Sequence, residues 1–329
     1  MRRPLRFALK SLAGLAVVAA VAAALLLGPY VARVRHVAAD PVAGFHSGYF
    51  LYVPPRIALD AKGVGMLLVQ PNNSGRTSDD VAVHERDAWW TGFERRRIAD
   101  TLGTPLLVPA FPRMASQWRV YTHALDRDSL TTREPVLARP DLQIVAMIDD
   151  ARRRLASDGI RLDARVLVQG FSASGMFANR FAVLHPGRVR AATVGSPGGW
   201  PIAPIARAGG DVLAYPAGIA DLPALTGHPF DAASFRRIPQ LIYMGDADDN
   251  DSLDFEDGWD PAMAARVSRR YGGTPLARWP AAEQLYRSAG SRARFERVPG
   301  VGHDRRALQD RSTAFFRTVM AADGRTKRR

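Results

Sequence analysis

The chain contains no cysteine, and this absence excludes several kinds of structure at once. None of its 329 residues carries a thiol, so the protein has neither a disulfide framework nor the lipid-linked cysteine of a bacterial lipoprotein. If the chain is exported, its core alone must stabilise it. No cluster of histidine, aspartate or cysteine has the spacing of metal ligands either. We therefore expect neither a metal ion nor an organic cofactor.

A continuous basic face is also missing, although the formal net charge is +13. Positive charge gathers at the two ends of the chain, at Arg2, Arg3, Arg6, Lys10, Arg33, Arg35, Arg325, Lys327, Arg328 and Arg329, and no acid precedes Asp40. Without these ten charges the body carries about +3, and its arginines are interspersed with acids. Nucleic-acid binding requires a basic face with aromatic side chains for base stacking, so the sequence argues against a nucleic-acid partner.

Charged residues are absent from residues 11–32, which are mostly alanine, valine and leucine. A helix over this stretch, at about 1.5 Å per residue, spans a hydrocarbon core of roughly 30 Å. We therefore predict a transmembrane anchor or a signal peptide, with residues 1–10 as a basic cytoplasmic segment and 33–44 as a linker. The small residues at 37–39 resemble a cleavage site but lie late, which favours an uncleaved anchor. The remaining chain is then held at the membrane outside the cytoplasm, or is secreted if the helix is cut.

The body of the chain alternates β and α patterns. Short apolar runs predict strands at 48–53, 65–70, 104–109, 165–169, 189–194, 240–244 and 293–298. Helices are predicted at 88–102, 142–157, 173–184, 261–270 and 305–322. This alternation predicts an α/β fold with a mostly parallel central sheet and helices on both faces. Functional side chains are then expected at the carboxyl ends of the strands.

The predicted domain covers residues 45–322 and is followed by a basic tail at 323–329. Two long insertions interrupt it, at about 199–236 and 251–290. Their aromatic residues either form a lid or substrate wall or simply pack at the surface, and the sequence leaves both readings open. The loop after the third strand, with Arg113 and Tyr121, is a further candidate wall of the pocket.

Ser172 lies where a predicted strand turns directly into a predicted helix. The strand leads into Gly170, and small residues, Ala173 and Ser174, follow the serine. A serine hydroxyl is a poor nucleophile at neutral pH, so it must project from a tight turn toward a base. The amino end of the next helix then faces the negative charge that develops. We predict Ser172 as the nucleophile, against the alternative of an ordinary serine-rich turn.

A base and an acid follow later in the chain, each just after a predicted strand. His303 lies in the glycine-flanked loop after 293–298, a context that the other histidines lack. Asp248 is the predicted acid because it follows Gly245 in a Gly-x-x-Asp pattern after 240–244, and Asp251 is held in reserve. The acid would fix the tautomer of His303 and stabilise the imidazolium when the base takes the serine proton.

These motifs together resemble the α/β-hydrolase superfamily, and in particular esterases of the polyhydroxybutyrate depolymerase and feruloyl esterase type. The similar stretches are 49–54, 66–73, 170–179 and 300–303, and the resemblance extends over about 45–320. The resemblance implies an oxyanion hole made by the backbone N–H of Ala173 and a second donor, which we place at Asn73. Many relatives have His-Gly where this chain has 70–73, so the second donor departs from the pattern of the family.

The sequence therefore predicts a serine hydrolase that cleaves a carboxylic ester through an acyl-enzyme intermediate. The substrate would be a small-molecule or polymeric ester. A peptidase of the same fold is the first alternative, because nucleophile, base and acid do not separate an ester from an amide. A non-catalytic exported binding protein on the same scaffold is the second alternative, since fold does not imply function.

Overall fold

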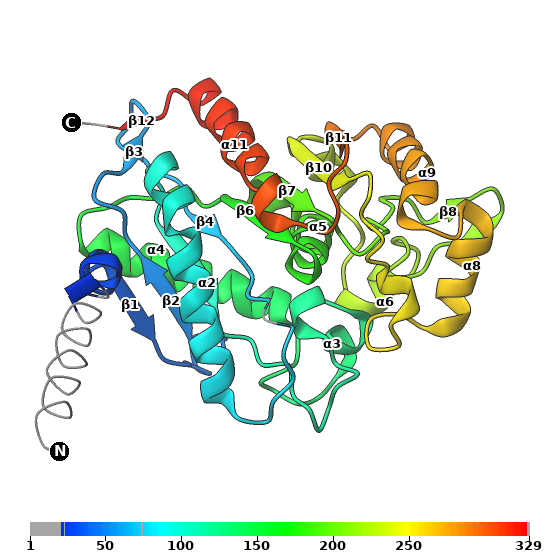
Figure 1. Ribbon diagram of the computed structural model, residues 1–329, viewed down its shortest axis with the longest axis horizontal. Coiled ribbons are helices and arrows are strands. Elements are labelled where there is room, and N and C mark those ends of the chain that lie inside the picture. Colours follow the sequence, from blue (N-terminus) through cyan, green and yellow to red (C-terminus); the bar gives the residue numbers. More distant parts are fainter. Residues whose placement is uncertain (1–20, 23, 74, 328–329) are drawn as a thin grey trace, which may run out of the picture.

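A sheet of eight strands organises the chain, whose residues 21–22, 24–73 and 75–327 are described by a computed structural model (Figure 1). Its strands in chain order are β1 (Val34–Val37), β2 (Tyr49–Tyr52), β4 (Leu68–Val69), β5 (Leu106–Pro109), β6 (Val166–Phe171), β7 (Val189–Gly195), β10 (Gln240–Gly245) and β11 (Ala293–Val298). Their order in the sheet is β1-β2-β5-β4-β6-β7-β10-β11. β2 is antiparallel to both of its neighbours, and every other pair is parallel.

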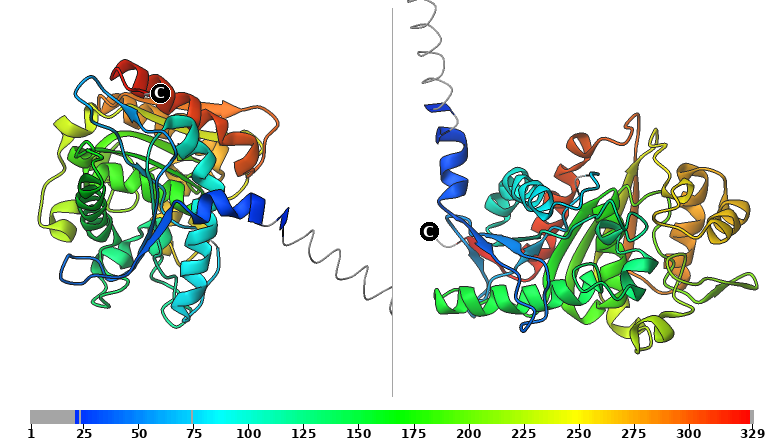
Figure 2. Two further views of the ribbon diagram at one scale, coloured as in Figure 1. Left: turned by 90° about the vertical axis from the view of Figure 1, so that its left-hand side faces the viewer. Right: turned by 90° about the horizontal axis from the view of Figure 1, so that it is seen from below.

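Four long helices cover the two faces of the sheet (Figure 1 and Figure 2). One face carries α2 (Val81–Leu102) and α11 (Asp310–Ala322), and the other carries α4 (Pro140–Ser157) and α5 (Ala173–Leu184). Successive side chains of a strand point to opposite faces. Leu106 accordingly packs in the cluster with α2 and α11, whereas Leu107 packs with α4 and α5. The predicted α/β fold with helices on both faces is therefore present.

Further elements lie in the segments that connect the strands of the large sheet or follow its last strand. They are η1 (Thr122–Ala124), α3 (Arg127–Thr131), η2 (Pro186–Arg188), β8 (Arg207–Ala208), β9 (Asp211–Val212), α6 (Leu222–Thr226), α7 (Ala232–Arg236), η3 (Ser252–Asp254), α8 (Pro261–Tyr271), α9 (Pro275–Ser288) and α10 (Arg305–Leu308). The aromatic residues singled out in the second insertion are nearly inaccessible, with Trp259 at 4%, Trp279 at 3% and Tyr286 at 1% exposure. These side chains are therefore part of the hydrophobic core, and they form neither an exposed lid nor a layer of aromatics at the surface.

The sequence predicts the strands better than the ends of the helices. All seven predicted strands are found. Helix α2 begins earlier than predicted because Asp80 caps it, accepting a hydrogen bond of 3.0 Å from the N–H of Ala82. Helix α9 has no predicted counterpart, since Pro280 lies inside it and interrupts the expected pattern. The predicted helix at 305–322 is divided after Leu308.

Part of the stretch predicted as a linker, residues 33–44, is an edge strand of the sheet. β1 pairs antiparallel with β2, with Val34 opposite Tyr52 and Val37 opposite Tyr49. Only Val37 is buried, while Arg35 and His36 are exposed. An edge strand with two polar members shows little apolar alternation, which explains why the sequence pattern does not reveal it.

Tyr30, at the end of the predicted membrane segment, belongs to the core of the domain. It lies in a helix over residues 24–31, is fully buried, and donates a hydrogen bond of 3.2 Å from its Oη to the carbonyl of Trp89. Its ring centroid lies 5.3 Å from that of Tyr52 and 5.6 Å from that of Phe93. Half of the predicted segment, residues 11–20 and 23, lies outside the described residues. Within the described ranges, no helix has the length and apolar character needed to cross a bilayer.

Replacing Tyr30 with alanine should lower the free energy of unfolding by about 3 kcal/mol, because a fully buried aromatic ring and its hydrogen bond are lost. Urea unfolding of the purified chain measures the effect. Val31→Ala is the matched control, since Val31 is its neighbour and is 55% exposed. Equal stability of the two variants would show that Tyr30 is not part of the folded core.

The predicted basic tail at 323–329 is partly folded. β12 (Thr326–Lys327) pairs antiparallel with β3 (Ala58–Leu59). The buried guanidinium of Arg325 lies 2.6 Å from Asp323 and 3.2 Å from Asp163. A buried charge needs such partners, and the sequence does not show that these acids lie near the tail. Residues 328–329 lie outside the described chain.

Candidate active site

Ser172 stands at a strained turn between β6 and α5. Its backbone has φ 60° and ψ −128°, a conformation that a residue with a side chain adopts at a cost of roughly 1–3 kcal/mol. The N–H of Ser172 donates to the carbonyl of Gly195 at 2.9 Å, which holds the turn against β7. Strain concentrated at one half-buried serine is typical of a functional position.

Two glycines and one serine make this turn sterically possible. A Cβ on Gly170 would lie 1.9 Å from the carbonyl oxygen of Ser174, and one on Gly175 would lie 2.4 Å from that of Gly195. The predicted need for small residues therefore holds at Gly170, but the second close approach falls on Gly175. Ser174 instead closes the turn: its Oγ accepts from the N–H of Phe171 at 3.0 Å and donates to the carbonyl of Phe171 at 2.9 Å.

Asp248 and His303 form a hydrogen-bonded pair in the loops after β10 and β11. The imidazole Nδ1 lies 3.0 Å from each carboxylate oxygen of Asp248. The Asp248 side chain is 2% exposed, whereas that of His303 is 26% exposed and reaches solvent. Burial is the largest single influence and raises the pKa of Asp248, but the surrounding hydrogen bonds, that of His303 first, and the charge of His303 together outweigh it, so the pKa is lowered. The carboxylate is thus ionised and orients the ring, with Nδ1 as the donor.

The structure brings this pair to the edge of the sheet that carries Ser172. The ring of His303 packs on that of Phe171, the residue before Ser172, with 4.8 Å between the ring centroids. Sequence reasoning did not single out Phe171, which appears only as the last residue of a strand. The Ser172 Oγ makes no hydrogen bond to any described residue. In unliganded enzymes such contacts are often open and tighten with substrate.

The predicted oxyanion-hole residues both lie beside the turn. Ala173 is the first residue of α5, so its N–H has no acceptor within the helix. Asn73 donates from Nδ2 to the carbonyl of Phe171 at 3.4 Å, which places it next to Ser172. Its neighbour Asn72 is fixed elsewhere: Nδ2 donates to the carbonyl of Phe111 at 2.8 Å and Oδ1 accepts from the N–H of Phe111 at 3.2 Å. Asn72 thereby positions Asn73.

The chain matches no family model and no curated protein, but its fold is found among solved structures. It is similar to poly(aspartic acid) hydrolase-1 from Sphingomonas sp. KT-1, with 19% identity, a TM-score of 0.54, and 88% of this chain and 97% of that chain covered. It is also similar to a poly(3-hydroxybutyrate) depolymerase from Bordetella parapertussis, with 20% identity, a TM-score of 0.55, and 89% and 92% covered. The chain has the α/β-hydrolase fold. The predicted resemblance to the α/β-hydrolases is confirmed at the level of the fold.

Asp251, the reserve acid, has a structural role in this α/β-hydrolase fold. Its carboxylate forms an ion pair with Arg278 and accepts a hydrogen bond of 3.1 Å from the N–H of Leu253, capping η3. The Arg278 side chain is fully buried and donates to the carbonyls of Gly199 and Gly272, each at 3.1 Å. Asp251 therefore ties the second insertion to the first.

Asp251→Asn should lower the free energy of unfolding by about 3 kcal/mol, because it leaves the buried guanidinium of Arg278 without its counter-charge. Any hydrolytic activity per folded molecule should change less than about threefold. Asp249→Asn is the control, since Asp249 is an exposed acid of the same loop. A large loss of activity with unchanged stability would instead make Asp251 the acid of the site.

A loop from the other side of the α/β-hydrolase fold forms a wall near Ser172. Tyr121 packs against the cluster that contains Ala173 and Met176. The guanidinium of Arg113 lies 4.0 Å above the Tyr121 ring and pairs with Asp257 of the second insertion. Tyr121 thus lies close to the turn that carries Ser172, and the prediction that it and Arg113 line a substrate pocket stays a prediction. Asp257 was not singled out, because it is one acid in an acidic loop.

Asp126 anchors this wall, and its environment predicts a pH-dependent stability. Its carboxylate caps α3, accepting from the N–H of Ser129 at 2.9 Å. Burial raises its pKa to about 7, so the folded state holds the proton more tightly than the unfolded state does. Stability must then fall as the pH rises from about 4 to 7. Asp126→Asn keeps the cap without the charge.

At pH 8 we expect the free energy of unfolding of Asp126→Asn to exceed that of the wild type by at least about 1 kcal/mol, which corresponds to roughly one pKa unit. This difference should shrink at pH 5. Urea unfolding at both pH values measures it. An advantage that is the same at pH 5 and pH 8 would contradict a raised pKa.

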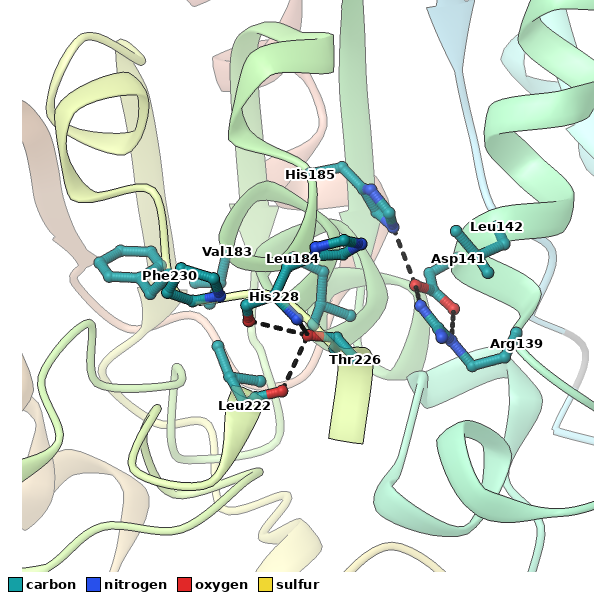
Figure 3. A pocket seen from close by; sticks show the side chains of 11 residues that line it. Arg139, Asp141, Leu142, Val183, Leu184, His185, Leu222, Thr226, His228 and Phe230 are labelled. Carbon is teal, nitrogen blue, oxygen red and sulfur yellow. Dashed lines mark hydrogen bonds and ion pairs between the residues drawn. The ribbon is translucent and has the colours of Figure 1, made fainter. Parts of the chain in front are cut away.

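A second Asp–His pair lies away from Ser172, around a cavity of about 150 Å³ that Figure 3 shows. His185 donates from Nε2 to Asp141 at 2.8 Å, and Arg139 donates to the same carboxylate from Nη2, also at 2.8 Å. His185 follows the carboxyl end of α5, whose amino end is at Ser172. At about 1.5 Å per residue the two lie roughly 20 Å apart. This pair joins α4 to the end of α5.

Proposed function

We propose that the protein is a serine hydrolase that cleaves a carboxylic ester, with Ser172 as nucleophile, His303 as base and Asp248 as the acid that orients it. One observation carries the proposal. The Asp248–His303 pair, joined at 3.0 Å, packs through Phe171 against the turn in which Ser172 holds its strained conformation. Side chains far apart in the sequence thus meet at one edge of the sheet, as the α/β-hydrolase arrangement requires.

In the first half of the reaction, the Ser172 Oγ attacks the carbonyl carbon of the ester while Nε2 of His303 takes the hydroxyl proton. The imidazolium that forms is stabilised by the ionised carboxylate of Asp248 at Nδ1. The negatively charged carbonyl oxygen accepts hydrogen bonds from the N–H of Ala173 and from Asn73. The intermediate collapses, His303 returns the proton to the leaving alcohol, and the acyl group remains on Ser172.

In the second half, water attacks the acyl carbon. His303 takes a proton from this water, and the same N–H groups receive the oxyanion. Collapse releases the carboxylic acid, and the proton returns to Ser172. The residues of this chain supply every proton transfer in the scheme.

An amide is the second candidate substrate, because the same groups cleave an amide once the leaving amine is protonated. The names of the similar proteins support both: one is a poly(3-hydroxybutyrate) depolymerase, which acts on a polyester, and the other a poly(aspartic acid) hydrolase. The ester is favoured on chemical grounds, since its carbonyl carbon is more electrophilic than that of an amide and an alcohol leaves more readily than an amine.

A fluorophosphonate probe tests the proposal. The wild type should be labelled and Ser172→Ala should not. Ser174→Ala is the matched control, because Ser174 lies two residues away in the same turn but points its hydroxyl into the protein. It should be labelled. Absence of labelling in the wild type would favour a non-catalytic binding protein. Parallel panels of p-nitrophenyl esters and aminoacyl amides then separate esterase from peptidase.

A further inference from the structure

The helix over residues 24–31 packs against the folded domain, which fixes its position relative to the neighbouring surface. Tyr30 is buried against α2, and β1 completes the sheet. A cut after residues 37–39 would remove both. The helical residues 24–29, which directly precede Tyr30, are therefore held at a fixed place on the domain. Leu25 and Leu26 are 72% and 62% exposed there.

A broad groove of about 830 Å³ lies next to this helix, between α2 and the α10–α11 segment. Leu26 forms one end of it. Both α2 and α11 belong to the face of the sheet from which the helix leaves (Figure 2). The lining has five arginines and only two acids, namely Arg96, Arg97, Arg305, Arg306, Arg317, Glu94 and Asp310. The groove thus combines positive charge with an exposed apolar helix.

Three of the groove arginines have no counter-charge within the described part of the chain. Arg97, Arg306 and Arg317 are all exposed, and none takes part in an ion pair among residues 21–22, 24–73 and 75–327. In contrast, Arg305 lies 2.7 Å from Glu94. Guanidinium groups bind phosphate oxygens through two parallel hydrogen bonds. Unpaired arginines in a groove beside an apolar helix therefore match the phosphate layer of a bilayer.

We propose that this groove binds the anionic phospholipid headgroups of the membrane that holds the amino-terminal helix. The helix brings the domain to the bilayer, and Arg97, Arg306 and Arg317 orient it there. Arg305 and Arg306 follow His303 by two and three residues, so the bound domain presents the His303 loop close to the bilayer surface. This proposal is independent of the reaction proposed above.

The absence of cysteine allows a direct test. The full chain carrying Ala314→Cys, in the groove, is labelled with a fluorophore and reconstituted into vesicles that contain acceptor-labelled lipid. Energy transfer to the lipid should be higher in vesicles with phosphatidylglycerol than in pure phosphatidylcholine, and should fall with added salt. Each arginine near an anionic surface contributes roughly fivefold to binding. Replacing Arg97, Arg306 and Arg317 with glutamine should therefore weaken the docked state about a hundredfold.

The matched control replaces three exposed arginines of the distant lobe, Arg266, Arg269 and Arg292, with glutamine, and should leave the energy transfer unchanged. Equal transfer in both lipid mixtures would overturn the proposal. An equal loss of energy transfer in both triple variants would overturn it as well. It would also fail if inorganic phosphate abolished the energy transfer at an ionic strength where chloride does not, because the groove would then be a site for a free anion. The proposal would also fail if the wild type did not float with phosphatidylcholine vesicles, because the amino-terminal helix would then not be held in the bilayer.

Discussion

Ser172→Ala should lower kcat for an activated ester by about six orders of magnitude, the loss seen when the nucleophile of such a site is removed. The reason is chemical: without Oγ no acyl-enzyme forms, and His303 has no hydroxyl to activate. The KM should change little, because the substrate pocket is intact. Hydrolysis of p-nitrophenyl acetate under initial-rate conditions measures the effect, together with the burst of p-nitrophenol that an acyl-enzyme produces.

Stability offers an independent check on the same variant. Ser172 holds φ 60° at a cost that alanine would share, so Ser172→Ala should unfold within about 1 kcal/mol of the wild type. Ser174→Ala removes hydrogen bonds to Phe171 and should lose about 1 kcal/mol while keeping most of its activity. If instead Ser174→Ala were inactive and Ser172→Ala active, the nucleophile would be misassigned.

The positions of Ser172, Asp248 and His303 could be predicted because each follows a strand with a strong apolar pattern. Parallel strands place their carboxyl ends at one edge, so β6, β10 and β11 alone imply that the three loops meet. The sequence pattern ranks Asp248 above Asp251 as the acid, but it cannot test that order. Only the structure shows that Asp251 is bound to Arg278, a residue that lies in a distant helix.

The parts that the sequence does not reveal are held by contacts between remote residues. β1 has an irregular pattern because it is an edge strand, and Tyr30 looks like the end of an apolar helix until Tyr52 and Trp89 are placed around it. The close approach at Gly175 depends on β7, which lies beside the turn only in the folded sheet. Local patterns predict elements, whereas these contacts require the packed chain.

Asp248→Asn should lower kcat by about 10⁴ with almost no loss of stability. An asparagine amide donates a hydrogen bond to Nδ1 of His303, where the carboxylate accepts one. The ring then holds its proton on Nε2, so that no lone pair faces Ser172. Since the pKa of Asp248 is lowered, the wild-type carboxylate stays ionised at neutral pH, and the comparison is clean at pH 7.

Comparing Asp248→Asn with Asp251→Asn decides which aspartate is the acid, because we expect opposite outcomes for the two variants. The first should lose activity and only a small part of its stability: the lowered pKa of Asp248 means that the folded state favours the ionised carboxylate, but asparagine keeps a hydrogen bond to His303. The second should keep activity per folded molecule and lose stability, since Arg278 is left unpaired. Initial rates and urea unfolding on the same preparations measure both. Activity within tenfold of the wild type in Asp248→Asn would mean that His303 is oriented by another group.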